Sequence, residues 1–250
     1  MISLLRKIRR SLVGSGQVGR YVLYAIGEIG LVVIGILIAL QINNHNEWRK
    51  DREQEQRVLI QLANNLQMNC DLLEDWIKGN EHASRFGEVV IDHFKHNKPY
   101  HDSLAPIIWM AELQWNNELP LVGYEALKNI GFDILQNEQL KENIMHLFEV
   151  EYPSLQNSFS WGKQDRGIQE QVFDRNFLRL DRKDGKNGLR YVPHDPKSIF
   201  ENDYLHAIYV KRQRQRAFYN SNMTETLELS KQVLALVKIE VDADYKINDN

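Results

Sequence analysis

The chain has 250 residues and a formal net charge of −3. This length allows one membrane anchor and one or two soluble domains. Its single cysteine, Cys70, excludes a disulfide framework or a cysteine-built metal site within one chain. The charge is uneven, because residues 1–20 carry five basic side chains and no acidic one. Such a basic head is typical of a segment that contacts a membrane surface.

Residues 1–20 predict a short amphipathic helix followed by a flexible joint that contains glycines. Apolar residues recur at helical spacing from Ile2 to Leu12. The basic residues between them are Arg6, Lys7, Arg9 and Arg10. A helix of this kind lies on anionic lipid. Nucleic acid is the other ligand of a basic patch, but an apolar run follows directly. We therefore expect contacts with membrane lipids and no binding of nucleic acid.

Residues 21–42 predict a transmembrane helix. The run from Tyr21 to Leu40 contains one charged residue, Glu28. At a rise of about 1.5 Å per residue this helix is about 30 Å long, which matches the hydrocarbon thickness of a bilayer. A cleaved signal peptide has an apolar region of only about 7–15 residues and a cleavage site of small residues, which residues 40–44 do not provide. We therefore expect an uncleaved anchor.

The charges that flank the apolar run predict its orientation. The head before it is only positive, whereas residues 47–57 after it mix both signs. Basic segments stay on the cytoplasmic side of a membrane. We therefore expect a cytoplasmic head at residues 1–20, a span in the bacterial inner membrane, and a periplasmic α-helical domain at residues 43–250.

Glu28 is the unusual residue of the predicted span. A charge at the centre of a bilayer costs about 2.5–3.5 kcal/mol, so such residues usually face a partner. Helical spacing places five residues on one stripe, namely Ala25, Glu28, Val32, Gly35 and Ala39. Small residues four apart let two membrane helices approach closely. The stripe predicts a contact with a second copy or with another membrane protein. A proton relay and a neutral, locally bonded carboxyl are the alternatives.

Three stretches of the amino-terminal region resemble a known family. They are RKIRR, YAIGEIGLVVIGILIALQINN and NEWRK, and the family has a tryptophan where this chain has His45. Further matching positions are Tyr124, Leu127, Gly131, Asn137, Leu140, Ile144 and Tyr152. The family consists of bacterial single-pass proteins that share a domain of unknown function. The resemblance implies this topology and a helical domain, and it brings no catalytic residues.

The sequence after the span predicts a helical bundle. A polar helix is expected from Asn44 to Lys78, ending at Gly79. Its apolar stripe is Leu59, Leu62, Leu66, Leu73 and Trp76, interrupted by Asn69. Such a stripe fits either a bundle or a parallel coiled coil, and the polar interruption favours the bundle. Two aromatic groups, around Trp109 and around Phe159, are expected in its core.

Further helices are expected at residues 81–95, 104–117, 122–131 and 137–151. Pro153 predicts a break, after which a helix resumes to about residue 177. Residues 181–197 contain two glycines and two prolines and predict a loop. Two helices follow, at residues 199–219 and 223–240, and Asn222 with Glu225 predicts the capping box of the second.

Two clusters of polar residues could in principle bind a ligand. His93 and His96 could share one helix face near His101 and bind a metal, but without an evident third ligand we expect exposed histidines and no metal. The basic run from Lys211 to Arg216 could bind an acidic partner, but we expect a solvated helix face. Phosphate loops, nucleophile elbows and paired cysteines are not found in the sequence, so no residue indicates an enzyme or a cofactor.

These observations predict a non-enzymatic single-pass protein of the inner membrane. It would be an accessory, scaffold or regulatory component of a cell-envelope complex that acts through helix–helix contacts. The main alternative is a periplasmic ligand-sensing domain that signals through the membrane helix. A proton-linked motor or transport subunit that uses Glu28 is a third possibility.

Overall fold

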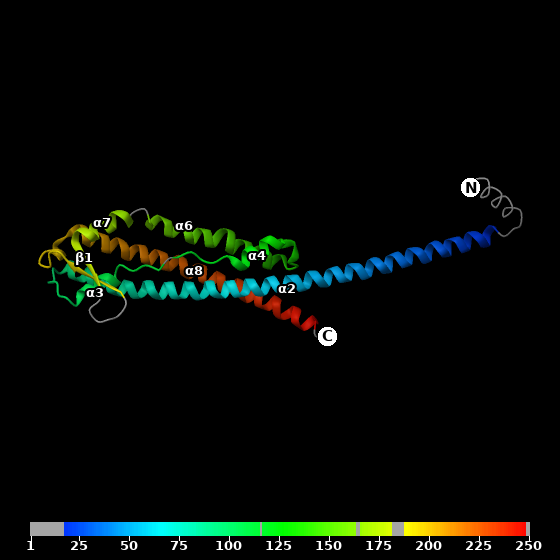
Figure 1. The fold of residues 1–250 in the computed structure, drawn as a ribbon, viewed down its shortest axis with the longest axis horizontal. Coiled ribbons are helices and arrows are strands. Elements are labelled where there is room, and N and C mark those ends of the chain that lie inside the picture. Colours follow the sequence, from blue (N-terminus) through cyan, green and yellow to red (C-terminus); the bar gives the residue numbers. More distant parts are fainter. Residues whose placement is uncertain (1–17, 116, 164–165, 182–187, 249–250) are drawn as a thin grey trace. The chain divides into compact units, whose positions relative to one another are not determined.

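The computed structural model describes residues 18–115, 117–163, 166–181 and 188–248. Helices dominate these residues, and one two-stranded sheet accompanies them (Figure 1). Two compact units meet in sequence between Gln54 and Glu55, and we call the second one the body, residues 55–250. The helical fold class expected from the sequence is confirmed.

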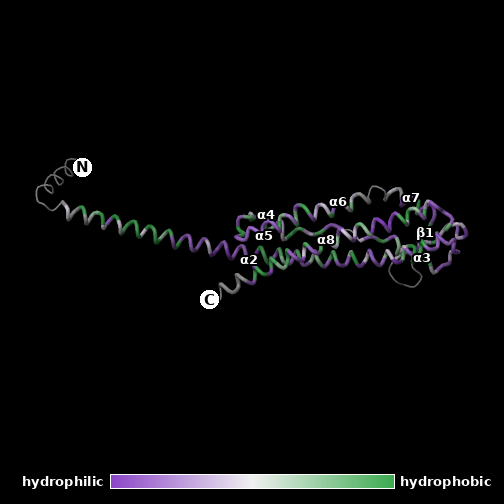
Figure 2. Tube along the Cα trace, turned by 180° about the vertical axis from the view of Figure 1, so that it is seen from behind, coloured by the Kyte–Doolittle hydropathy of each residue, from purple (hydrophilic) through white to green (hydrophobic). Residues whose placement is uncertain are grey.

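Helix α2 (Val18–Lys95) contains the predicted span and continues into the body. From Ile26 to Trp48 its large apolar side chains are exposed, and Figure 2 shows the first part of α2 as hydrophobic. Among the described residues, α2 is the one helix long and apolar enough to cross a membrane. It is therefore a candidate membrane span.

Gly79 does not end the helix, contrary to expectation. The expected helices at 44–78 and 81–95 are parts of α2. A Cβ atom at Gly79 would lie 2.6 Å from Cδ2 of Trp115, so this glycine allows the indole ring to pack against the helix. Close packing, and not helix termination, is the reason for a glycine here.

Short helices follow α2. They are α3 (Leu104–Met110), α4 (Val122–Ile130), η1 (Phe132–Ile134), α5 (Glu138–His146), the π-helical turn η2 (Leu147–Glu151), α6 (Tyr152–Lys163) and α7 (Arg166–Asn176). The break predicted at Pro153 does not occur, because this proline lies in the first turn of α6, where it is tolerated. The wider turn η2 precedes it, which leaves room where the proline ring would otherwise meet the carbonyl of Glu149.

The predicted loop at residues 181–197 is partly a β-hairpin. Strand β1 (Phe177–Asp181) pairs antiparallel with β2 (Leu189–Pro193), and Phe177 lies opposite Pro193. Residues 182–187 lie outside the described residues. Strands of five residues are too short for a clear alternating pattern, which explains why the sequence did not reveal them.

Helix α8 (Asp203–Asn248) replaces the two helices expected at 199–219 and 223–240, and the turn η3 (Ile199–Glu201) precedes it. The predicted capping box at Asn222 is wrong, because α8 passes through it without interruption. The Asn222 carbonyl accepts a bond from the Thr226 hydroxyl at 2.9 Å, as in a helix interior.

The body has two hydrophobic cores. The first lies between the α2 residues from Val58 to Trp76, helices α4 to α6, and the α8 residues from Tyr219 to Val237. The second lies between the end of α2, α3, α7, the hairpin and the start of α8. Helices α2 and α8 run antiparallel, since Gln213 reaches Ser84 and Lys238 reaches Gln67.

The leucine stripe of α2 packs within this one chain. Leu59, Leu62, Leu66, Leu73 and Trp76 all lie in the first core. A parallel coiled coil would need the same side chains at an interface between two copies, so the arrangement supports the bundle. Cys70 is a buried free cysteine in this core, and burial raises the pKa of its thiol to about 11.

Three buried asparagines of α2 hold the segment that joins α3 to α4. The Asn80 amide donates to the Trp115 carbonyl at 3.0 Å and accepts from its N–H at 3.1 Å. Asn65 and Asn69 both donate to the carbonyl of Pro120, at 2.9 and 3.0 Å. These bonds satisfy backbone groups that a helix would have used internally, and α3 accordingly ends at Met110 although 104–117 was expected to be helical.

Candidate functional site

A polar layer separates the two cores of the body. Along α8 the second core ends near Tyr209 and the first begins at Tyr219, and Arg212 and Arg216 lie between them. Both arginines are buried, and the side chain of Arg216 is among the largest fully buried ones. The expected solvated face is therefore wrong for these two residues of the basic run.

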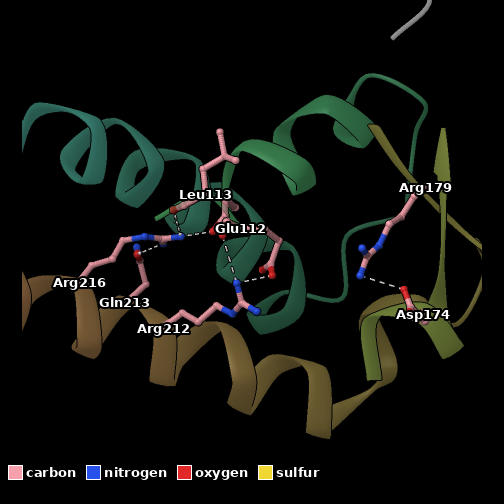
Figure 3. A network of polar contacts seen from close by, with 8 residues as sticks. Glu112, Leu113, Asp174, Arg179, Arg212, Gln213 and Arg216 are labelled. Carbon is pink, nitrogen blue, oxygen red and sulfur yellow. Dashed lines mark hydrogen bonds and ion pairs between the residues drawn. The ribbon is translucent and has the colours of Figure 1, made fainter. Parts of the chain in front are cut away.

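Arg216 is held by main-chain oxygens (Figure 3). Its Nη2 donates to the carbonyls of Ala111 and Leu113, the latter at 3.1 Å, and Nη1 donates to Oε1 of Gln213 at 2.9 Å. Burial lowers the pKa of its guanidinium to about 10, which leaves the group protonated at neutral pH. Arg216 thus fixes the chain that leaves α3 against α8.

Arg212 forms a buried ion pair with Glu112 (Figure 3). Its Nη1 contacts Oε2 of Glu112 and also donates to the Glu112 carbonyl at 3.3 Å. Its guanidinium carbon lies 5.1 Å from the centre of the Phe173 ring. Burial raises the pKa of the Glu112 carboxyl to about 7, and the neighbouring Arg212, Arg216 and Arg179 oppose that rise. Contacts with the Glu112 main chain and with the Phe173 ring therefore hold the Arg212 side chain in place.

A pocket of about 210 Å³ opens beside this ion pair. A second ion pair lies at it: Nη2 of Arg179 on β1 is 2.9 Å from Oδ1 of Asp174 on α7. Arg179 also lies over Tyr191 of β2, at 5.7 Å from the ring centre. The lining residues are Glu112, Leu113, Gln114, Gln169, Glu170, Phe173, Arg179, Tyr191, Arg212 and Gln215.

Two polar groups at this pocket have no partner among the described residues. Oε1 of Glu112 is buried without a hydrogen bond. Nε of Arg212, which also lines the pocket, is the second buried atom without a hydrogen bond. Buried polar atoms normally form hydrogen bonds. The ion pair beside the pocket therefore leaves one acceptor and one donor without a partner among the described residues.

The predicted span interface stays on one face of α2. Glu28, Val32, Gly35 and Ala39 are exposed, and Ala25 is partly exposed. A Cβ atom at Gly35 would meet nothing within 4 Å. The stripe residues thus lie at helical spacing on α2, with their side chains exposed. The lipid-contacting residues Arg6, Lys7, Arg9 and Arg10 lie outside the described residues.

The histidines near the end of α2 pack with aromatic rings. His93 is buried, with its ring 5.0 Å from Phe200 and 5.7 Å from His101, so the expectation of exposure is wrong for His93. His96 is exposed, and its Nδ1 lies 2.9 Å from the Asp92 carboxylate. Among the described residues no group of three or more histidine, cysteine or acidic side chains could hold a metal.

A helical pattern could have revealed the buried arginines. The buried face of α8 repeats at intervals of four and three residues, through Leu205, Tyr209, Arg212, Arg216, Tyr219 and Met223. Arg212 and Arg216 occupy core positions of this repeat. Dividing α8 into two helices at residues 219–223 hid the pattern.

The comparisons with known proteins concern α2. No curated protein and no solved structure matches the chain. One family model matches, over a stretch that contains most of the predicted span stripe together with Asn65, Asn69 and Asn80. Most of the candidate span and the asparagine-bearing part of the body thus fall within one matched region. Residues 28–89 match the model of a family of unknown function, DUF6090.

Proposed function

We propose that this chain is a single-pass protein of the bacterial inner membrane that acts, without catalysing a reaction, as an assembly component of a cell-envelope complex. Its head would be cytoplasmic and its body periplasmic. The observation that carries the proposal is the exposed apolar surface of α2 from Ile26 to Trp48, which contains the stripe with Glu28. An apolar helix surface needs lipid or another helix to cover it.

The stripe has the properties of a helix–helix contact in lipid. Gly35 and Ala39 are four residues apart and have no bulky side chain, so a second backbone can approach them. Glu28 lies on the same face, where its carboxyl can exchange a hydrogen bond with a partner helix and avoid contact with lipid chains. The partner would be a second copy or another membrane protein.

Disulfide crosslinking in membranes tests this contact. Gly35→Cys and Ala39→Cys should give a dimer or heteromer band under mild oxidation, whereas Leu37→Cys, on the opposite face, should not. The unsubstituted chain is the background control, because Cys70 is buried. Absence of any band at 35 and 39, or equal bands at 37, would contradict the proposed interface.

A matched pair of glycine variants tests whether the contact matters for assembly. Gly35→Leu should reduce copurification of partners in mild detergent, whereas Gly30→Leu places the same side chain on the other face and should not. Glu28→Gln keeps a hydrogen-bonding group and should be better tolerated than Gly35→Leu. If Glu28→Gln alone abolished function while assembly persisted, a proton-linked motor or transport subunit would replace this proposal.

Protease added to spheroplasts tests the orientation. The proposal expects the body to be digested in intact spheroplasts and a fragment of the first 50 or so residues to remain, since a span of about 20 residues protects the amino-terminal region. Protection of the body until the membrane is lysed would show the opposite topology.

The pocket in the body favours a second candidate function. A periplasmic sensing domain would bind a small ligand there and pass the change to the membrane through α2. The unpartnered Glu112 carboxylate oxygen and Arg212 Nε support this candidate, because buried polar groups without partners are unusual in a purely structural core.

A further inference from the structure

We propose that the pocket between the hairpin, α7 and α8 binds a small zwitterion, a free α-amino acid being the chemical class that fits it. This inference rests on the second candidate function and names its ligand class. The residues that carry it are Gln169, Glu170, Arg179, Arg212 and Glu112, all of which line the pocket.

The pocket presents both signs of charge. Arg179 and Arg212 supply two cations, and Glu112 and Glu170 supply two carboxylates. A simple anion would gain from the arginines but meet two carboxylates, and a simple cation would meet two guanidinium groups. A molecule with one carboxylate and one ammonium group can place each next to its opposite charge, and no net charge is added to a half-buried site.

The charged side chains are fixed before a ligand arrives. Arg212 pairs with Glu112, and Arg179 pairs with Asp174 (Figure 3). In addition, Arg212 lies over the ring of Phe173 and Arg179 over the ring of Tyr191. Stacking on an aromatic face restricts the guanidinium plane while its edge can still donate hydrogen bonds. Groups held in this way lose little conformational entropy on binding, so a small ligand can bind with useful affinity.

The remaining polar groups suit the main-chain atoms of an amino acid. The Gln169 side chain lines the pocket, and its amide offers two donors and one acceptor. Glu170 is exposed and lines the pocket next to Gln169 on α7, where it can accept from an ammonium group. The pocket of about 210 Å³ is smaller than the sites of about 300–1,000 Å³ that hold drug-sized molecules, which limits the ligand to a small metabolite.

Thermal unfolding of the full-length protein in detergent micelles tests the ligand class. The probes are the 20 common L-amino acids, each at about 1 mM, with acetate and methylammonium as half-ligands at the same concentration. A ligand present at about 100 times its Kd stabilises the folded state by about 2.7 kcal/mol, which moves the melting temperature by several degrees. We expect at least one amino acid to do so and neither half-ligand to match it.

Three variants locate the binding. Arg179→Gln and Glu170→Gln should each weaken binding of the stabilising amino acid at least tenfold by calorimetry. Both residues are exposed, so the variants should fold, and their melting temperatures without ligand check this. Arg190→Gln is the matched control, since Arg190 belongs to the same hairpin and bonds the Asp181 carbonyl but does not line the pocket. It should bind like the unsubstituted chain.

The outcomes separate this inference from the proposed functions. No stabilisation by any amino acid, equal stabilisation by acetate, or unchanged affinity in Arg179→Gln would each overturn it. If an amino acid binds as expected but leaves the Gly35→Cys crosslinking unchanged in membranes, the ligand assignment stands and signalling through α2 fails. The crosslinking result without ligand tests the assembly proposal independently.

Discussion

The two parts of helix α2 carry similar apolar side chains but bury them differently. Leu37 in the candidate span is 58% exposed, whereas Leu66 in the body is 0% exposed. The span is apolar on all sides and has one polar stripe residue, Glu28. In the body, leucines occupy one face, and Asn65, Asn69 and Asn80 are buried among them. Hydrophobicity alone therefore does not distinguish a lipid-facing helix from a core helix, and the placement of polar groups does.

Leu66→Ala against Leu37→Ala should show the largest difference between the two parts. Leu66 is enclosed by the first core, so its truncation leaves a cavity and should lower the free energy of unfolding by about 2–5 kcal/mol. Leu37→Ala should leave the melting temperature of the body unchanged. Circular dichroism of the full chain in micelles measures both. Equal destabilisation by the two variants would remove the distinction.

Asn80→Ala against Asn43→Ala compares buried and exposed amides. The Asn80 variant leaves the N–H and the carbonyl of Trp115 without partners in a partly buried place, which should cost about 2 kcal/mol. Asn43 is exposed and donates to Glu47 one helical turn away, so its loss should cost less than about 0.5 kcal/mol. Denaturant unfolding measures both, and a costly Asn43→Ala would show a contact beyond Glu47.

Gly123→Ala against Gly35→Ala compares two glycines near or on α2. A Cβ atom at Gly123 would lie 2.7 Å from the Gln61 carbonyl oxygen, so α4 must move away from α2. We expect a loss of about 1–2 kcal/mol, because overpacking is partly offset by the helix preference of alanine. Gly35→Ala meets nothing within 4 Å and should not alter body stability. Thermal unfolding measures both variants. If Gly123→Ala left the stability unchanged, α4 could move away from α2 without cost.

His93→Phe against His45→Phe should give the smallest effect, visible only in its pH dependence. Burial lowers the pKa of His93 below its usual 6.5, so the unfolded chain takes up the proton more readily than the folded one. This contribution to stability is complete above about pH 6.5 and is lost as the pH falls. His93→Phe should therefore reduce the drop in melting temperature between pH 7.5 and 5.5.

The control for this prediction is His45→Phe. His45 is exposed, so replacing it should leave the pH dependence as it is in the unsubstituted chain. A drop that is the same in His93→Phe and in the unsubstituted chain would show that His93 takes up its proton equally well in the folded state.

Local patterns in the sequence predicted most of the helices but misplaced their ends. The helices expected at 122–131 and 137–151 are present, the second as α5 followed by the π-helical turn η2, and Phe159 is buried as expected. Each of these predictions depends on residues close in sequence. Gly79, Pro153 and Asn222 were misread because their local signals for an end or a break were overridden by contacts with distant segments or by the π-helical turn.

The pocket and its ion pairs could not be predicted from the sequence. Glu112 and Arg212 are 100 residues apart, and only the packing of the segment after α3 against α8 brings them together. A basic run such as KRQRQR has the composition of a solvated face, and its burial becomes evident only from the helical repeat that continues through Tyr219. The stripe of the span, in contrast, is local, and its helical spacing followed directly from the sequence.

The buried asparagines of α2 limit where residues can be inserted into this helix or deleted from it. Leucines alone would tolerate a shift of α2 by one turn, about 5.4 Å, against its neighbours. Asn65 and Asn80 bond fixed points of one crossing segment, at Gly123 and Trp115. An insertion or deletion between them would separate one asparagine from its partner, whereas point substitutions at exposed positions would not. The number of residues between Asn65 and Asn80 is therefore constrained more tightly than the identity of the exposed residues between them.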